Sequence, residues 1–284
     1  MKSDANDPAR PIGVFDSGMG GLTVLRALHE RLPGEDIIYF GDTARLPYGT
    51  KGEKTVRTFA RQDAGLLVEL GVKMVIVACN TASAFALEHL RETISVPVLG
   101  VINPGVRTAL AHTRGGAVGV IGTSGTIRSR RYQDGLARGG LGPERILVQE
   151  CPLFVPLVEE GMMGHAMTKM AVEEYLHPLR DAGVDTLILG CPHYPALKED
   201  IALFMGPGVT LVDSADALAE AAQERLAELS LLRTEAGRAG ELEFYLSDIP
   251  WKFQEIGARF LGKPITEVIT VGLDEMEAAG EISE

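Results

Sequence analysis

The sequence has little of what several large protein classes require. Its 284 residues include three cysteines, Cys79, Cys151 and Cys191, which are too few and too scattered for a disulfide framework. No apolar run approaches the roughly 20 residues of a membrane span, and the opening MKSDANDPARP has no apolar core of a signal peptide. We therefore expect a cytoplasmic protein without a membrane partner, whose thiols stay reduced.

Positive charge is also scarce. The 27 Lys and Arg residues stand against 39 Asp and Glu residues, the net charge is −12, and the densest basic cluster is the short RSRR. We expect no nucleic-acid partner, because neutralising phosphates needs a basic face. An anionic small molecule is still allowed, because backbone N–H groups and helix N-termini bind anions locally. Apolar residues are plentiful at 45 %, and the length is ample for one large domain or two ordinary ones.

Short apolar runs alternate with amphipathic stretches along most of the chain. Several runs are rich in Val and Ile without alternation, as expected for strands covered on both faces. This order of strands and helices favours an α/β fold with mainly parallel sheets. The expected strands are 12–15, 36–40, 73–78, 98–101, 117–121, 145–149, 186–189 and 210–212, and the clearest expected helices are 53–70, 83–92, 167–182 and 215–232.

The C-terminal region has a different character. Residues 248–262, DIPWKFQEIGARFLG, predict a helix of moderate amphipathicity with Pro250 near its start. Residues 272–284, GLDEMEAAGEISE, are acidic and poor in apolar side chains, so we expect them to be frayed.

Two pairs of similar segments indicate an internal duplication. The pairs are IGVFDSG (12–18) with VGVIGTS (118–124), and GVKMVIVACNT (71–81) with GVDTLILGCPH (183–193). Chance likeness between apolar strands would explain one pair, whereas two pairs in the same order favour duplication. A duplication predicts two similar lobes that face each other. Cys79 and Cys191 would then approach a common cleft from opposite sides.

The loops after the predicted strands carry the residues with chemical potential. Active sites in such sheets lie at the carboxyl ends of the strands. Cys79 precedes capping residues of a helix, where the helix dipole lowers the pKa of a thiol. His193 lies two residues beyond Cys191 and could exchange a proton with the thiol or with a substrate. Asp16 ends the first strand beside a glycine-rich turn whose N–H groups could hold a carboxylate.

Several interpretations of the two thiols are open on this basis. A cysteine at the end of a core strand is commonly a packing residue. A zinc site formed by Cys79, Cys191 and His193 is another, although C-x-H is not a usual zinc spacing and no CxxC is present. Two symmetric thiols also suit proton transfer at a carbon atom. One thiolate would remove a proton, and the opposite thiol would return one to the other face, while preorganised donors stabilise the carbanion-like state.

Seven motifs then identify a resemblance. In chain order they are GVFDSGMGGLTVLRAL, YFGDTARLPYGTK, VIVACNTASA, GVINPG, GVIGTSGTI, CPLFVPLVEEG and GCPHYPAL. Together they resemble the glutamate racemases of the aspartate/glutamate racemase superfamily. The resemblance implies two pseudo-symmetric α/β lobes, with mainly parallel sheets flanked by helices and the active site in the cleft between them. Residues 1–101 and 209–284 would form the first lobe, and 102–208 the second.

The resemblance also implies an activity. It is a cofactor-independent, two-base racemisation of L- and D-glutamate, with no metal, that supplies D-glutamate for peptidoglycan and so serves cell-wall biogenesis and cell shape. A related two-cysteine racemase of another amino acid, such as aspartate, is the alternative. We expect a homodimer, since homodimers are the commonest oligomers.

The resemblance assigns roles residue by residue. Cys79 would exchange the proton with D-glutamate and Cys191 with L-glutamate. Asp16 would assist Cys79, His193 would assist Cys191, and Glu159 would place a carboxylate near the second thiol. The implied substrate contacts are Asp16, Ser17, Tyr48, Gly49, Asn80, Thr81, Pro192 and His193, with Thr123 and Ser124 as weaker candidates and Cys151 as a packing residue.

One position departs from the family's pattern. The family usually has GCTHYP, whereas position 192 here is proline. Proline removes a hydroxyl and a backbone N–H and fixes φ. The loss of one hydrogen bond to a charged substrate group costs roughly 1.5–3 kcal/mol. We therefore expect Pro192 to affect substrate affinity on the Cys191 side, while both thiols and His193 remain.

Overall fold

The computed structural model of the chain describes residues 7–235, 237–250 and 252–281. The strands are β1 (Ile12–Asp16), β2 (Ile37–Gly41), β3 (Met74–Val77), β4 (Val98–Gly100), β5 (Ala117–Gly122), β6 (Ile146–Glu150), β7 (Val184–Gly190), β8 (Thr210–Asp213), β9 (Leu242–Leu246) and β10 (Ile269–Thr270). The α-helices are α1 (Leu22–Arg31), α2 (Glu53–Glu69), α3 (Asn80–Thr93), α4 (Ile102–His112), α5 (Ser124–Arg128), α6 (Arg131–Arg138), α7 (Phe154–Glu159), α8 (Ala166–Asp181), α9 (Lys198–Met205), α10 (Ser214–Glu228), α11 (Phe253–Leu261) and α12 (Leu273–Glu281). Short 3₁₀ helices are η1 (Tyr48–Thr50), η2 (Pro143–Arg145) and η3 (Tyr194–Leu197).

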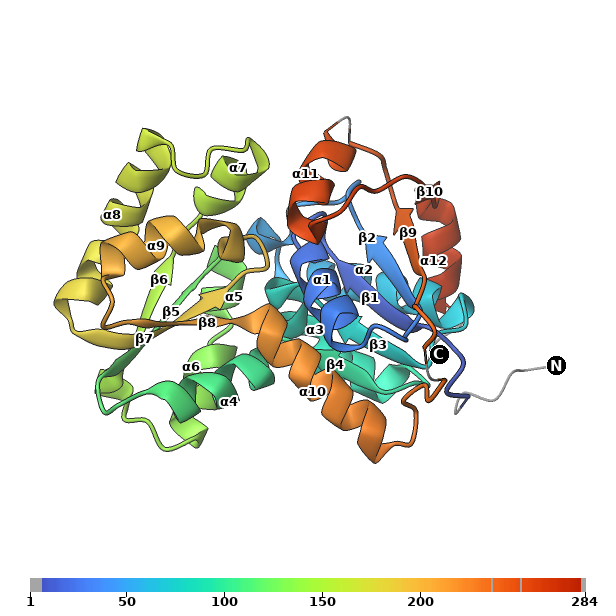
Figure 1. Ribbon diagram of the computed structural model, residues 1–284, viewed down its shortest axis with the longest axis horizontal. Helices are drawn as coiled ribbons and strands as arrows, with labels where there is room; N and C mark the ends of the chain where they lie inside the picture. The colour runs from blue at the N-terminus through green and yellow to red at the C-terminus, as the bar shows by residue number, and fades with distance from the viewer. Residues whose placement is uncertain (1–6, 236, 251, 282–284) are drawn as a thin grey trace.

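Two parallel sheets form the centres of two lobes that lie side by side (Figure 1). The first sheet has the strand order β10-β9-β2-β1-β3-β4, and the second has the order β6-β5-β7-β8. Helices cover the faces of both sheets, which explains why the central strands are apolar without alternation. The predicted α/β class with mainly parallel sheets is confirmed.

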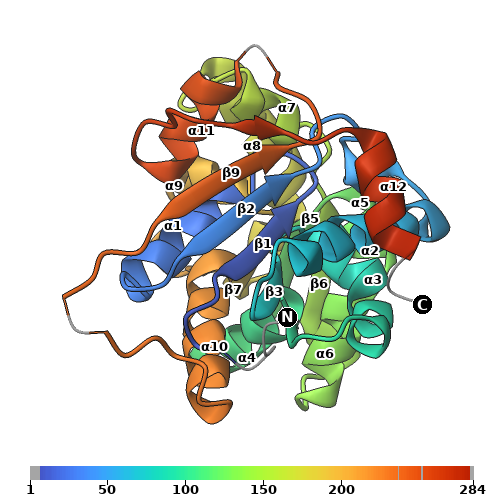
Figure 2. The same cartoon turned by 90° about the vertical axis from the view of Figure 1, so that its right-hand side faces the viewer.

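The eight predicted strands are all present, and each lies within two residues of its expected ends. The four clearest predicted helices are also confirmed as α2, α3, α8 and α10. β9 and β10 were not predicted. β10 has only two residues, both exposed, and only Phe244 and Leu246 of the five residues of β9 are buried, so neither forms a buried apolar run. Figure 2 shows β9 lying beside β2, and β10 pairs with the other side of β9 at the edge of the first sheet.

The predicted duplication is visible in strand order and in register. When β5 to β8 are matched to β1 to β4, the two sheets have the same order, with the first strand of each set between the second and the third. Ile12 pairs with Met74 in the first sheet, and Val118 pairs with Thr186 in the second. These are the positions that the two superposed sequence segments equate. The strand ends that carry the cysteines are therefore structurally equivalent.

The predicted boundary at residue 209 is contradicted by one strand. β8 was assigned to the first lobe, but it pairs in parallel with β7 of the second sheet. The chain then crosses along α10, which packs on both α1 and α4. We therefore infer that the second lobe ends after Asp213 rather than at residue 208.

The C-terminal segment also differs from the expectation. The predicted frayed end forms α12, which packs against α2 and buries Met276 and Ala279. These two apolar residues are three positions apart and share one helix face, a signal that the acidic composition masked. A Cβ atom at Gly65 of α2 would lie 2.5 Å from the carbonyl oxygen of Ala279, so glycine permits this close packing. Residues 282–284 lie outside the described residues.

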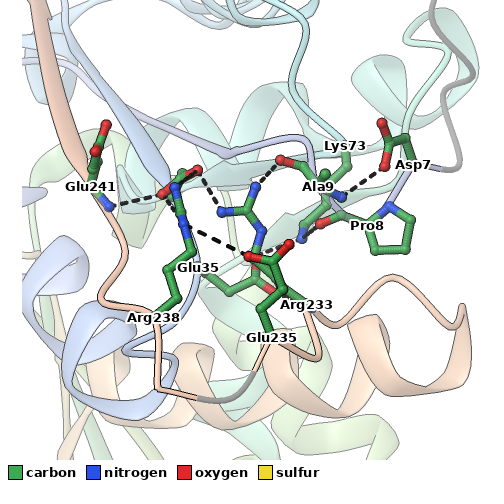
Figure 3. Close-up of polar contacts among 10 residues, drawn as sticks. Asp7, Pro8, Ala9, Glu35, Lys73, Arg233, Glu235, Arg238 and Glu241 are labelled. Atoms are coloured by element: carbon green, nitrogen blue, oxygen red, sulfur yellow. Dashed lines mark hydrogen bonds and ion pairs between the residues drawn. The ribbon is translucent and has the colours of Figure 1, made fainter.

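A buried ion pair lies at the amino-terminal ends of strands β2 and β3 in the first sheet (Figure 3). The Lys73 side chain is fully buried, donates to the carbonyl oxygen of Pro8 at 2.7 Å and pairs with the Glu35 carboxylate. The other oxygen of Glu35 accepts the backbone N–H of Arg233 at 2.8 Å. The pair therefore ties the start of the chain and the α10–β9 connection to the sheet.

Asp36 holds the same connection from the neighbouring position. Its carboxylate contacts the guanidinium groups of Arg233 and Arg238 at 2.6 Å each and accepts the N–H of Glu241 at 2.9 Å. Partial burial works to raise the pKa of Asp36, but the hydrogen bonds from Arg238 and Glu241 lower it to about 2.

No helix in the described part of the chain is long and apolar enough to cross a membrane.

Replacing Glu35 with alanine should lower the free energy of unfolding by about 3–5 kcal/mol, because the buried Lys73 ammonium loses its carboxylate. Urea denaturation measures this change. The matched control is Glu224→Ala, which breaks the exposed pair with Arg107 and should cost under about 1 kcal/mol. Equal losses in the two variants would refute the role given to the buried pair.

Candidate active site

A cavity of about 330 Å³ lies between the lobes, at the carboxyl ends of the central strands. This size suits a small metabolite. Every residue predicted for catalysis or substrate binding lines it: Asp16, Ser17, Tyr48, Gly49, Cys79, Asn80, Thr81, Glu159, Cys191, Pro192 and His193, with Thr123 and Ser124 beside them. The structure therefore brings together in one place a set drawn from both halves of the sequence.

Two equivalent strand ends deliver the two thiols. Cys79 follows β3 and is the N-cap of α3, while Cys191 follows directly after β7. Each cysteine is 5 % exposed. Because the two strands have equivalent positions in their sheets, the thiols enter the cavity from opposite lobes.

The surroundings of Cys79 keep its thiol protonated. The N–H of Ala82 donates to its sulfur at 3.4 Å, and the thiol lies 3.7 Å from the hydroxyl oxygen of Ser17. Burial and the nearby Asp16 carboxyl nevertheless raise the pKa of Cys79 to about 12. The sequence-based expectation of a lowered pKa at this helix N-terminus is wrong, because desolvation outweighs the N–H group.

Asp16 is the carboxyl group of the Cys79 side. Its Oδ2 accepts the N–H of Gly18 at 3.0 Å, whereas its Oδ1 is buried without a hydrogen-bond partner among the described residues. Burial raises the pKa of Asp16, an effect that the charge of His193 and the N–H groups of the turn only partly offset. The turn must be tight, since a Cβ atom at Gly21 would lie 2.5 Å from the Asp16 Cβ.

A histidine serves the Cys191 side. Nδ1 of His193 lies 3.8 Å from the Cys191 sulfur, and Nε2 lies 3.0 Å from Oε1 of Glu159. Burial alone would lower the pKa of His193, but the hydrogen bonds and charges of Cys191 and Glu159 raise it to about 10. His193 therefore holds a proton within reach of the Cys191 sulfur at neutral pH.

The first lobe helps to seat this histidine. A Cβ atom at Gly20 would lie 2.3 Å from Nδ1 of His193, so the glycine turn after β1 makes room for the ring. The ring also meets Phe260 of α11 edge to face, with centroids 5.6 Å apart. In addition, the hydroxyl of Thr23 donates to the carbonyl oxygen of Pro192 at 2.9 Å. The loop from Cys191 to His193 thus depends on contacts from both lobes.

Other residues of the site escaped the sequence analysis. Tyr132 of α6 is fully buried, and its hydroxyl accepts the side-chain N–H of Asn80 at 2.7 Å. Thr126 adds a hydroxyl 3.2 Å from that of Thr81, which also lies 2.9 Å from the hydroxyl of Thr123. No local signal marks Tyr132, since it stands in a helix away from the motif loops.

Two residues that were predicted to contact the substrate, Tyr48 and Ser124, use their side-chain hydroxyl groups in hydrogen bonds within the protein. The hydroxyl of Tyr48 contacts Asp42 and Asp63, which leaves its ring and backbone to line the cavity. The Ser124 hydroxyl donates to the Glu150 carboxylate. Across the described ranges, no group of three or more His, Cys, Asp or Glu side chains is arranged to hold a metal ion.

Comparison with known proteins gives consistent matches. A family model described as Asp/Glu/Hydantoin racemase matches residues 12–222. The chain is 50 % identical to the glutamate racemase of Geobacter metallireducens over 94 % of this chain and 98 % of that protein. The solved glutamate racemase of Francisella tularensis, in complex with D-glutamate, matches with a TM-score of 0.86 and 40 % identity over 94 % of this chain and 99 % of that one. The aspartate racemase of Picrophilus torridus shares the fold alone, at 17 % identity and a TM-score of 0.54 over 78 % of this chain and 98 % of that one.

Replacing Glu159 with glutamine should lower the pKa of His193 below its value of about 10, because the carboxylate that helps to raise it is lost. An NMR titration of the His193 ring protons measures the shift. Glu160→Gln is the matched control, since Glu160 pairs with Lys252 at 2.7 Å and should leave the titration unchanged. A shift with Glu160→Gln and none with Glu159→Gln would make the neighbouring acid the partner instead.

Proposed function

Because the chain belongs to the Asp/Glu/hydantoin racemase family, among its glutamate racemases, we propose that Cys79 and Cys191 interconvert L- and D-glutamate as a pair of acid and base. The chain is an amino-acid racemase. The observation that carries the proposal is the placement of two thiols at equivalent strand ends, on opposite walls of one cavity. A planar carbanion between them can be protonated on either face.

The side chains that can give and take protons in the site suit this reaction. From L-glutamate, the Cys191 thiolate takes the α-proton, and the Cys79 thiol gives its proton to the opposite face of the carbon. The product is D-glutamate, with the thiol and the thiolate exchanged, and the reverse reaction restores the start. The raised pKa of Cys79 suits a proton donor. His193, which holds a proton at neutral pH, lies beside Cys191, and the Asp16 carboxyl lies near Cys79, so each can assist its thiol.

Two unpaired acceptors indicate where the α-ammonium group binds. Oδ1 of Asp16 and Oδ1 of Asn80 are both buried without a hydrogen-bond donor within the described ranges, and both residues line the cavity. Buried acceptors are normally paired. An ammonium group has three N–H donors and no acceptor, which matches this need.

Neutral donors are left for the two carboxylates. The cavity lining, as far as the structure describes it, includes the hydroxyls of Ser17, Thr81 and Thr123 and backbone N–H groups, but no Lys or Arg side chain. Neutral donors can hold an anion without adding a further positive charge to that of protonated His193. The charge that develops on the α-carbon is then met by preorganised dipoles.

We extend the proposal to the setting of the enzyme. D-Glutamate made here would supply peptidoglycan synthesis, and so cell-wall biogenesis and cell shape. The reaction needs free thiols, which favours the reducing cytoplasm. A homodimer is the expected assembly, as the commonest closed form.

Replacing either Cys79 or Cys191 with serine should lower racemisation by about 10²–10⁴-fold, the usual contribution of one positioned acid or base. The assay follows deuterium wash-in at the α-carbon and the appearance of the opposite enantiomer, starting from L- and from D-glutamate. Cys151→Ala is the control, because this buried cysteine does not line the cavity and should leave the rate unchanged. Full activity in either Cys79→Ser or Cys191→Ser would refute the two-base mechanism, and exchange with aspartate but not with glutamate would refute the substrate.

Replacing Pro192 with threonine should lower KM for glutamate by about tenfold, because a regained N–H and hydroxyl can bond a charged substrate group. Steady-state kinetics with both enantiomers measure the effect. Pro195→Ala, in η3 and away from the cavity lining, is the control and should leave KM unchanged. If KM stays the same in Pro192→Thr, neighbouring donors already make that bond.

A further inference from the structure

A buried polar cluster lies beneath the loop 46–50, and the mechanism above does not use it. All five residues of this loop line the cavity. The Tyr48 side chain extends into this cluster, where its hydroxyl lies 2.8 Å from Oδ2 of Asp63 and also contacts Oδ2 of Asp42. Both carboxyl groups are fully buried, so their charge must be balanced inside the protein.

Arg45 supplies the balancing charge. Its guanidinium contacts Oδ2 of Asp42 at 2.7 Å and Oδ1 of Asp63 at 2.9 Å. It also stacks over the ring of Phe59, with the guanidinium carbon 4.2 Å from the centroid. Ser247, which follows β9, donates to Oδ1 of Asp42 at 2.9 Å. Elements far apart in the chain therefore meet at this cluster.

The number of hydrogens decides the charge of the two carboxyl groups. The Tyr48 hydroxyl has one hydrogen, yet it is within hydrogen-bond distance of oxygens from both carboxyl groups. With both carboxylates ionised, one of these contacts would have no hydrogen, and two negative charges would face one guanidinium. A further proton on one carboxyl group satisfies both contacts and leaves one negative charge for one positive charge.

Asp63 is the better holder of this proton. Asp42 accepts donors from three side chains, Arg45, Tyr48 and Ser247, which stabilise its ionised form. Burial and the neighbouring charge of Asp42 raise the pKa of Asp63 well above its usual range. In this arrangement the Asp63 carboxyl donates to the Tyr48 oxygen, and the Tyr48 hydroxyl donates to Asp42.

We propose that protonated Asp63 and ionised Asp42 are positioning residues, which hold the loop 46–50 against glutamate through the Tyr48 hydroxyl. The inference rests on the proposed function, because the loop is taken to bind that substrate. The loop carries neither of the two thiols that transfer the proton, so loosening it weakens binding more than it slows proton transfer. On the other side the loop is closely packed, since a Cβ atom at Gly49 would lie 2.7 Å from Cβ of Thr123.

A matched pair of isosteric variants tests the two charge states. Asp63→Asn keeps a neutral group that can donate to Tyr48, so KM should stay within about twofold, whereas Asp42→Asn removes the ionised partner and should raise KM about tenfold with kcat nearly kept. Tyr48→Phe should behave as Asp42→Asn does. Equal effects of the two asparagine variants, or a loss in kcat rather than a rise in KM, would overturn the proposal.

The pH dependence gives a second readout. The charged and titratable groups around Asp63 are Asp42, Arg45 and Tyr48, with Asp16 farther off in β1. As pH rises and Asp63 loses its proton, two carboxylates compete for one hydroxyl hydrogen, so KM of the wild-type enzyme should rise. The Asp63→Asn variant should not show this rise. The same KM profile in both proteins would contradict a proton on Asp63.

An infrared measurement separates this inference from the proposed function. The wild-type protein at neutral pH should show the carbonyl stretch of a protonated carboxyl group that is missing from Asp63→Asn. The difference spectrum requires no turnover and no folded Asp42→Asn variant. If the wild-type protein fails to racemise glutamate, the proposed function fails while the band still tests Asp63. If the band is absent, the proton on Asp63 is refuted whatever the activity.

Discussion

The burial of ionisable groups, whose protons and charges are balanced only by neighbouring side chains, is the constraint on which the rest of the site depends. Each thiol is taken out of water, so its proton is controlled by its neighbours rather than by solvent. On one side the neighbour is a carboxyl group, Asp16, and on the other it is the imidazole of His193, fixed by Glu159. The loop 46–50 rests on a third buried set, which has its own internal balance of charge.

The two lobes are joined by polar contacts that belong to the site itself. The Asn80 side chain donates to Tyr132, the Thr81 and Thr123 hydroxyls lie 2.9 Å apart, and Thr23 donates to the carbonyl oxygen of Pro192. Each contact joins a residue within two positions of one thiol to a residue of the other lobe. A change in the relative position of the lobes would therefore alter the donors and acceptors around the substrate. The same polar groups that hold the two lobes together therefore also surround the reacting thiols.

Much of the fold could be predicted because buried parallel strands are continuous apolar runs. β9 and β10 could not, since their residues are partly exposed and make no such run. The site residues could be predicted because they follow strand ends in recognisable motifs. The space that Gly20 leaves for His193 could not be predicted, because this contact exists only once the lobes are packed. The pKa of Cys79 was mispredicted for a similar reason, since the depth of burial depends on tertiary structure.

The unequal partners of the two thiols meet a limit set by thermodynamics. Enantiomers have equal free energies in water, so the equilibrium of the reaction favours neither. The Haldane relation then requires kcat/KM to be the same in both directions, whatever groups flank each sulfur. A carboxyl on one wall and an imidazole on the other can therefore make the two kcat values differ only if the two KM values differ by the same factor. The asymmetry of the site decides how fast the enzyme works when saturated with each enantiomer, and it cannot give the reaction a preferred direction.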